Sequence, residues 1–75
     1  MTTHRFKSTP MNWIKEADGR KPNTVRKIEM GDPRNRIKEG DTIEIYNTLT
    51  GEVFSRKVMD VTLWEDLTII SWRHA

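Results

Sequence analysis

The segment from Glu52 to Leu63 constrains the fold most, because its alternation of apolar and polar residues changes phase part-way along. Phe54 lies in one phase and Leu63 in the other. Since the side chains of a strand point alternately to its two faces, a straight strand would turn these two residues to opposite sides. We predict a β-bulge or bend near Val58 to Asp60, which lets one strand serve two sides of a small barrel.

Shorter alternating segments predict the other strands. Thr3 to Ser8 alternates around Phe6, which favours an edge strand with a single core residue. Thr42 to Tyr46 has the clearest alternation, and Asn47 to Gly51 is the predicted hairpin loop after it. The remaining predictions are a strand over Thr24 to Met30, a loop over Gly31 to Arg36 in which Pro33 forbids helix, a turn over Trp64 to Leu67 and a last strand over Thr68 to Trp72.

One short helix is predicted from Pro10 to Asp18. Thr9 can cap its free amide groups, and Pro10 fits the first helical position because its missing N–H costs nothing there. Gly19 ends the helix as a residue that adopts the left-handed conformation. So short a helix is not stable alone, so we expect it to pack an apolar face on a sheet. That predicted face consists of Met11, Trp13, Ile14 and Ala17.

Together these elements predict a single α+β domain over residues 1–75 that is mostly β. The expected architecture is a small, strongly curved pseudo-barrel of about five short strands with one N-terminal helix. An SH3-like barrel with an added helix is the alternative fold. A chain of this length buries only about 60% of its unfolded surface, so its large aromatic side chains are expected to provide much of the core.

Composition excludes several kinds of site. The chain has no cysteine, which rules out disulfides, thiolate metal sites and a cysteine nucleophile. His4 and His74 lie at opposite ends without companions at metal-ligand spacing, so we expect no metal and no cofactor, with His4 exposed and His74 in a frayed terminus. No apolar run is long enough for a membrane span and no signal peptide is visible, so we expect a cytoplasmic protein that does not bind membranes.

Positive charge is concentrated in the middle of the chain. Between Arg20 and Lys38, seven basic residues stand against only Glu29 and Asp32. A basic segment that faces one way is the electrostatic footprint of an anionic partner. The alternative interpretation is a solvated surface that happens to be rich in lysine and arginine.

Several motifs in this region occur together. Gly19 to Arg26 spells G-R-K-x-x-T-V-R, and Ile37 to Ile45 spells I-x-x-G-D-x-I-x-I. With the tryptophan-bearing helix before them and V-x-x-V near W-x-D-L after them, they resemble the ASCH domains, small relatives of the RNA-binding PUA domain. The resemblance covers Trp13 to Leu67 and implies a PUA-like pseudo-barrel with a ligand cleft at the helix end. The residues that match the family's cleft motif are Gly19, Lys21, Thr24 and Arg26.

The first functional hypothesis is binding of RNA or a nucleotide. Arginine and lysine side chains would contact phosphates, with Thr24 and Arg26 near a base or sugar edge, and such binding should weaken steeply with salt. The predicted binding residues are Arg20, Lys21, Thr24, Arg26, Arg34 and Arg36. In the alternative structural interpretation, Arg26 pairs with Glu44 or Asp41 across the sheet and Gly19 is only a helix stop.

The strand over Thr24 to Met30 leaves its own orientation open. The apolar residues within it do not keep one parity, so either Arg26 or Lys27 could face inward. If Val25 is in the core, Thr24 and Arg26 share the opposite face of the sheet, together with whatever the loop at Lys21 supplies.

The second hypothesis is catalysis. Some ASCH proteins are amidohydrolases that remove an acyl group from a modified cytidine, with a lysine and a threonine spaced as Lys21 and Thr24 are, together with a glutamate. A threonine hydroxyl becomes nucleophilic only when a neighbouring base takes its proton. The acidic candidates after the long strand are Glu65 and Asp66, and neither lies in an evident strand.

The third hypothesis is a phage-type protein that binds a host protein; under all three hypotheses we expect a monomer. Small, charge-rich single domains without cysteine are common among such proteins. An exposed cluster of Tyr46, Trp64 and Trp72 would favour a protein interface, whereas burial of these aromatic residues would place them in the core.

Overall fold

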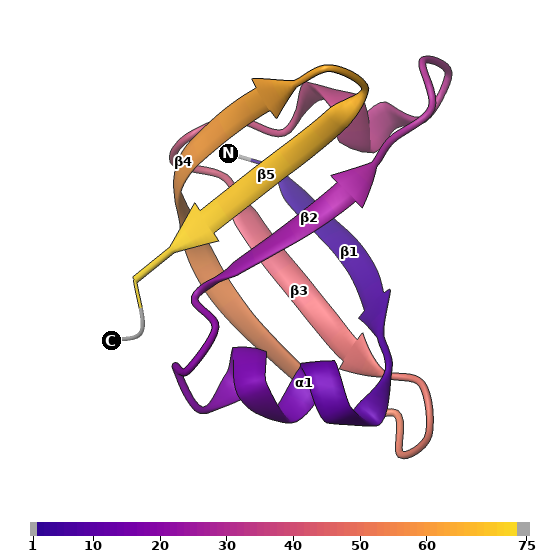
Figure 1. The fold of residues 1–75 in the computed structure, drawn as a ribbon, viewed down its shortest axis with the longest axis vertical. Coiled ribbons are helices and arrows are strands. Elements are labelled where there is room, and N and C mark those ends of the chain that lie inside the picture. Colours follow the sequence, from indigo (N-terminus) through magenta and orange to yellow (C-terminus); the bar gives the residue numbers. More distant parts are fainter. Residues whose placement is uncertain (1, 74–75) are drawn as a thin grey trace.

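The computed structural model describes residues 2–73 as a strongly curved sheet with one α-helix at its end (Figure 1). In chain order the elements are β1 (Thr3–Ser8), α1 (Pro10–Ala17), β2 (Asn23–Lys27), the 3-10 helix η1 (Pro33–Arg36), β3 (Thr42–Asn47), β4 (Val53–Trp64) and β5 (Leu67–Trp72). The fold is α+β and mostly strand, a five-stranded curled half barrel, which confirms the predicted fold class. Within residues 2–73, no helix has both the length and the apolar character needed to cross a membrane.

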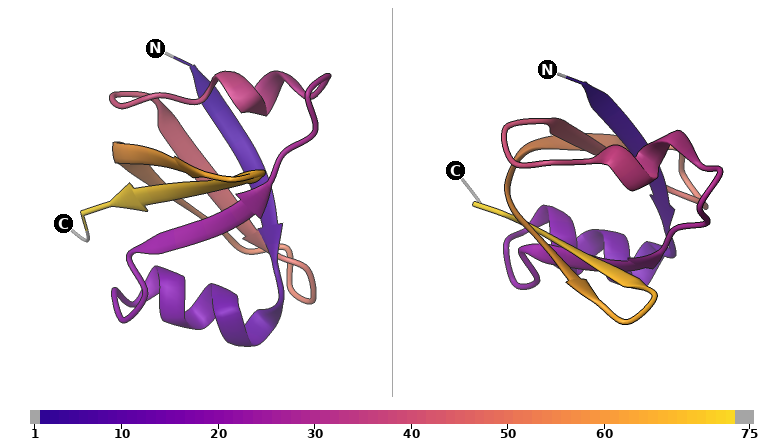
Figure 2. Two further views of the ribbon diagram at one scale, coloured as in Figure 1. Left: turned by 45° about the horizontal axis from the view of Figure 1, so that its top comes forward. Right: turned by 90° about the horizontal axis from the view of Figure 1, so that it is seen from above.

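The order of the strands across the sheet is β1-β3-β4-β5-β2, so β1 and β2 form its two edges. β1 runs parallel to β3, whereas the other neighbouring strands are antiparallel. The sheet curls until these two edges come near each other (Figure 2). We call this meeting of Thr3–Ser8 with Asn23–Lys27 the seam. In the described part of the chain, β1 and β2 are not neighbours in the hydrogen-bonded sheet, so side chains join them.

The bend predicted in the longest strand is confirmed. The first part of β4 pairs with β3 and the second part with β5, and the register shifts between Val58 and Asp60. Gly51, with a φ of 78°, completes the hairpin turn before β4 as predicted. Because β4 belongs to both halves of the curled sheet, the bulge marks where the strand passes from one half to the other.

The core fills the inside of the curl. Trp72 is only 4% exposed, and Trp13 packs against the buried cluster from α1. The indole N–H of Trp13 donates to the backbone oxygen of Ile45 at 2.9 Å, which fixes the helix against β3. The buried apolar residues of the described chain are Phe6, Ile37, Ile43, Ile45, Val58, Ile70 and Trp72.

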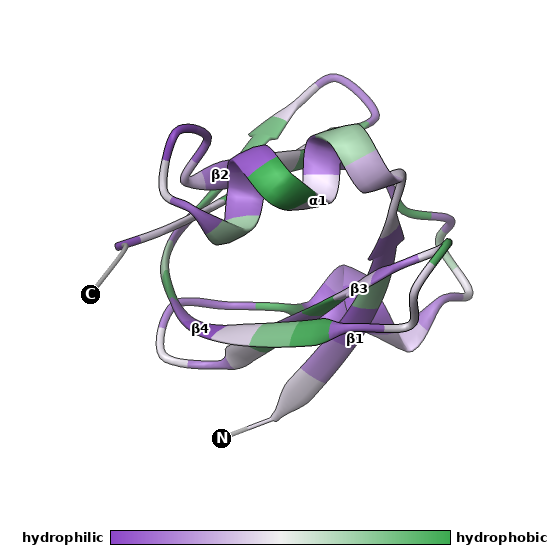
Figure 3. Cartoon of the chain, turned by 90° about the horizontal axis from the view of Figure 1, so that it is seen from below, coloured by the Kyte–Doolittle hydropathy of each residue, from purple (hydrophilic) through white to green (hydrophobic). Residues whose placement is uncertain are grey.

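The helix turns a different face to the sheet from the one predicted. Met11 and Ile14, predicted to be buried, are 74% and 50% exposed. The buried side is formed by residues one turn apart, Trp13 and Glu16, beside the half-buried Ala17. The short helix therefore covers one end of the curl with a narrow stripe, and hydrophobic and hydrophilic segments alternate along it (Figure 3).

The segment that follows α1 also differs in detail. β2 ends at Lys27 rather than Met30, and its inner face carries Thr24, which is 3% exposed, and the half-buried Arg26. Val25 is 48% exposed and lies outside the core, and of Arg26 and Lys27 it is Arg26 that faces inward. Pro33 does not forbid helix: it begins η1, because a proline in the first turn lacks only an N–H that the helix would leave unpaired.

Candidate ligand-binding site

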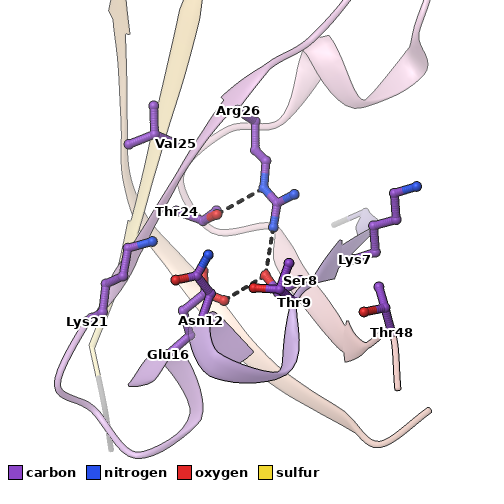
Figure 4. A pocket seen from close by; sticks show the side chains of 10 residues that line it. All are labelled: Lys7, Ser8, Thr9, Asn12, Glu16, Lys21, Thr24, Val25, Arg26 and Thr48. Carbon is purple, nitrogen blue, oxygen red and sulfur yellow. Dashed lines mark hydrogen bonds between the residues drawn. The ribbon is translucent and has the colours of Figure 1, made fainter. Parts of the chain in front are cut away.

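A pocket of about 350 Å³ lies at one end of the seam, between the end of β1, the start of α1 and β2 (Figure 4). We call it the seam pocket, and its central polar lining consists of Ser8, Glu16, Lys21, Thr24 and Arg26. The volume falls within the range typical of small-molecule sites, roughly 300 to 1,000 Å³. The residues come from three different elements, so the pocket exists only in the folded chain.

Simple periodicities bring these side chains together. Every second residue of β1 is buried, which turns Ser8 inward together with Phe6. The same alternation turns Thr24 and Arg26 inward on β2. The seam therefore supplies polar groups from both sheet edges to one place.

The turn that ends α1 places Lys21 at the pocket. Gly19 has a φ of 90°, the left-handed conformation predicted for it, and turns the chain after α1. The backbone N–H of Lys21 then donates to the oxygen of Lys15 at 3.0 Å. This closure holds the loop against the helix, and the Lys21 side chain lines the pocket (Figure 4).

A continuous set of hydrogen bonds crosses the seam. Arg26 donates from Nε to Thr24 Oγ1 at 2.9 Å and from Nη2 to Ser8 Oγ at 3.0 Å. The Ser8 hydroxyl donates to Glu16 Oε1 at 2.7 Å. We call these four residues the polar chain, since they connect β2, β1 and α1 in turn. In a closed barrel, backbone hydrogen bonds would join the two edge strands. Here the side-chain hydrogen bonds of the polar chain connect β1 and β2 instead.

Glu16 is the most deeply buried member of the polar chain. Its side chain is 1% exposed, and its Oε2 atom has no hydrogen-bond partner among residues 2–73. Buried carboxylates are costly unless they are paired and fully hydrogen-bonded, so a half-satisfied one points to a role beyond packing.

Electrostatics in the pocket are set by Arg26 and its neighbours. Burial lowers the pKa of Arg26, the nearby Glu16 carboxyl raises it in part, and Arg34 lowers it further. Arginine is so basic that Arg26 keeps its charge, so the site holds a partly desolvated cation. Its guanidinium also lies 5.2 Å from the centre of the Phe6 ring, a cation–π distance.

Arg34 lies beside the seam but is held by other groups. Its Nη2 donates to Asp32 Oδ2 at 2.6 Å, its Nη1 donates to the backbone oxygen of Arg5 at 3.0 Å, and its guanidinium lies 4.7 Å from the Phe6 ring centre. Hydrogen bonds from Arg34 hold the pKa of the Asp32 carboxyl at about 2, and Asp32 raises the pKa of Arg34. The charge of Arg34 is therefore largely balanced by its own neighbour.

The other two predicted arginines lie outside the pocket. Arg20 is exposed and pairs with Asp18 at 2.8 Å, and Arg36 is exposed on η1. The structure thus brings Lys21, Thr24 and Arg26 together in the lining of the seam pocket. The other three predicted residues, Arg20, Arg34 and Arg36, do not line it.

The acidic residue of the pocket is not one of those that the sequence suggested. Glu65 and Asp66 form the β4–β5 turn and line a second cavity of about 500 Å³, where Asp66 pairs with Lys27 at 3.2 Å. The seam pocket instead contains Glu16 and Ser8, which sequence reasoning missed. The signal that could have found Glu16 is its position three residues after Trp13, on the same side of the helix.

His4 is not exposed as expected. Its ring is 6% exposed and its Nε2 lies 2.9 Å from Asp41 Oδ2, at the other end of β1 from the pocket. Asp41 therefore does not pair with Arg26, and Glu44 pairs with Arg5 at 3.2 Å. His74 lies outside the described residues.

The aromatic cluster proposed for a protein interface does not form. Trp64 is 65% exposed, whereas Trp72 is 4% exposed in the core and Tyr46 is half-buried. The alternative, a place in the core, holds for Trp72 and not for Trp64, which lies at the end of β4 beside the β4–β5 turn.

No protein-family model and no curated protein matches this chain. The resemblance to ASCH domains therefore stays a prediction from the motifs. The motif residues Lys21, Thr24 and Arg26 nevertheless line one pocket, next to the helix stop at Gly19.

Proposed function

We propose that this chain is a small ASCH- or PUA-like domain that binds RNA or a nucleotide, with one nucleotide held in the seam pocket. The observation that supports this most is the convergence of Lys21, Thr24 and Arg26 in one cavity of small-molecule size. Each of these residues lies in the motif that resembles the ASCH domains. Two independent features bring them to the pocket: the alternation of β2 turns Thr24 and Arg26 inward, and the turn at Gly19 carries Lys21 to the same place.

The chemistry of the pocket suits a phosphorylated ligand. Lys21 provides a mobile ammonium group, and Arg26 uses only Nε and Nη2 in hydrogen bonds with residues 2–73. Its Nη1 group remains for a phosphate oxygen, and charge-assisted bonds of this kind are among the strongest polar contacts in proteins. Hydroxyl groups of Thr9 and Thr48 at the rim could contact a sugar.

Titration calorimetry with adenosine and cytidine 5′-monophosphates tests this proposal. Lys21→Ala should weaken nucleotide binding about tenfold or more, because it removes a charged donor from the pocket. Lys57→Ala is the matched control, since Lys57 is an exposed lysine on β4 that does not line the pocket. Absence of binding by the unaltered protein, or equal losses in both variants, would overturn the proposal.

Arg20 and Arg36 distinguish a mononucleotide site from an RNA site. Both are exposed and lie outside the pocket, so they can contact phosphates only of a longer strand. If RNA is the ligand, Arg36→Ala should weaken the binding of a short single-stranded RNA and reduce its salt dependence. The affinity for a mononucleotide should not change. A mononucleotide-only protein would bind the RNA no better than its single nucleotides.

A second candidate function is hydrolysis of an acylated cytidine, and one observation favours it. Lys21 and Thr24 share the pocket with a carboxylate, that of Glu16. In such a reaction Lys21 would accept the proton of the Thr24 hydroxyl, whose oxygen attacks the acyl carbon, and the proton would pass to the departing amine. Water would then release the acyl group from Thr24 as a carboxylic acid.

Incubation with N4-acetylcytidine tests the second candidate directly. Formation of cytidine and acetate would support hydrolysis if it is lost in Lys21→Ala and Thr24→Ala and kept in part in Thr24→Ser, which retains a nucleophilic hydroxyl. No product over long incubation, with acetylcytidine bound, would leave the pocket as a binding site.

A further inference from the structure

The polar chain ends at a carboxylate, that of Glu16, one oxygen of which no residue of the described chain contacts by a hydrogen bond. Ser8 donates its only hydroxyl hydrogen to Glu16 Oε1 and accepts from Arg26, so it has no further hydrogen to donate. Glu16 Oε2 has no partner within residues 2–73. Lys21 and Arg26 therefore keep unused donors at the pocket, and Glu16, which also lines it, keeps one buried carboxyl oxygen without a partner among residues 2–73.

Packing alone does not explain a glutamate at this position. Residue 16 lies on the same buried side of α1 as Trp13, where an apolar side chain would be buried without a desolvation penalty. Position 16 is also in the last turn of the helix, where the helix dipole disfavours a negative charge. The carboxylate is thus buried against two unfavourable effects, which its attraction to Arg26 offsets in part, and only one of its oxygens has a hydrogen-bond partner among residues 2–73.

We propose that Glu16 determines specificity: its unpaired carboxylate oxygen accepts an N–H donor from the base of the bound nucleotide. This inference rests on the proposed function. The ligand class is then a nucleotide whose base carries an exocyclic amino group, with its phosphate on Lys21 and Arg26. Carboxylates are suited to this contact, as in the recognition of the cytosine amino group. The terminal torsion of a glutamate is soft, so the oxygen can meet a ligand without backbone movement.

A thermodynamic cycle over ligand and protein tests this contact. Adenosine 5′-monophosphate is compared with purine riboside 5′-monophosphate, which lacks only the 6-amino group, and cytidine 5′-monophosphate with its 4-deamino analogue. The unaltered protein should prefer the amino member of at least one pair by about tenfold or more. In Glu16→Gln this preference should fall below about twofold, because the amide that keeps Ser8 satisfied turns its NH₂ toward the ligand.

The matched control is Glu39→Gln, which removes the same charge from an exposed loop residue that does not line the pocket. This variant should keep the preference. Equal binding of amino and deamino ligands by the unaltered protein would overturn the role of Glu16 while leaving the nucleotide site intact. No binding of any of the four would instead overturn the proposed function. Because the comparison in the unaltered protein decides the question, poor folding of Glu16→Gln would not rescue the inference.

Discussion

Two buried carboxylates, those of Asp41 and Glu16, lie near opposite ends of β1 and differ in how many hydrogen bonds they accept. Asp41 is 2% exposed and accepts hydrogen bonds from the backbone of Thr2 and Lys38 and lies 2.9 Å from His4 Nε2. Glu16 is 1% exposed and receives one hydrogen bond from residues 2–73, that of the Ser8 hydroxyl. The first site is complete in the folded chain, whereas the second leaves an oxygen for something else.

The two sites also differ in what surrounds them. The Asp41 site joins the start of β1 to the start of β3, two strands that are already paired, and it lines neither of the cavities described above. The Glu16 site lies where β1 and β2 approach without pairing, and it opens on the seam pocket. A satisfied network within a ladder stabilises the fold, and an incomplete one beside a cavity is suited to a ligand.

The largest expected effect that distinguishes the two sites is the loss of thermal stability when the Asp41 carboxylate is removed. Asp41→Ala should lower the thermal midpoint by on the order of 10 °C, because His4 and two backbone N–H groups lose their buried acceptor. Asp66→Ala is the matched control, since its ion pair with Lys27 is exposed and should change the midpoint little. Equal midpoints for the two variants would show that the Asp41 site does not hold the fold together.

The second effect is on the pH dependence of stability. Hydrogen bonds from His4 lower the pKa of the Asp41 carboxyl, and those from Arg34 lower that of Asp32 from 3.8 to about 2. Because the folded-state values lie below the ordinary one, ionised Asp41 and Asp32 stabilise the folded state. That stabilisation is complete above pH 3.8 and is lost as the pH falls toward about 2.

Thermal unfolding between pH 5 and pH 2 measures this effect. The midpoint of the unaltered protein should fall through this interval. It should fall less in an Asp32→Asn variant, which no longer has the carboxylate. Parallel curves for the two proteins would mean that the Arg34 pair contributes nothing to acid stability.

The smallest effect on stability is expected at Glu16. Glu16→Met should lower the free energy of unfolding clearly less than Asp41→Ala does, because the Glu16 carboxylate receives one hydrogen bond from residues 2–73 whereas that of Asp41 has three partners. Nucleotide binding should nevertheless weaken. A loss of stability as large as that of Asp41→Ala, measured by chemical unfolding, would make Glu16 a structural residue and break the contrast.

Much of the fold could be predicted because local patterns determine it. The change of phase in β4 required a bulge, and the structure has it between Val58 and Asp60. Gly19 and Gly51 both adopt the positive φ that their turns need. The alternation of β1 around Phe6 likewise predicted its bounds and its place at the sheet edge.

The candidate site could be predicted only in part. Lys21, Thr24 and Arg26 share one motif, so a sequence pattern could group them. Ser8 and Glu16 join them only because the sheet curls and α1 folds back over its end, which no local pattern encodes. Met11 and Ile14 were misplaced because a helix of eight residues can turn either of two sides to a sheet, and the anchoring of Trp13 on Ile45 decides which.

The most direct test of the seam pocket is a titration of isotope-labelled protein with adenosine 5′-monophosphate, followed through backbone amide shifts. The pocket predicts shifts that cluster around Ser8, Glu16 and the segment from Lys21 to Arg26, with the amides around Asp41 unchanged. Shifts confined to the Asp41 end of β1, or none at saturating nucleotide, would contradict it.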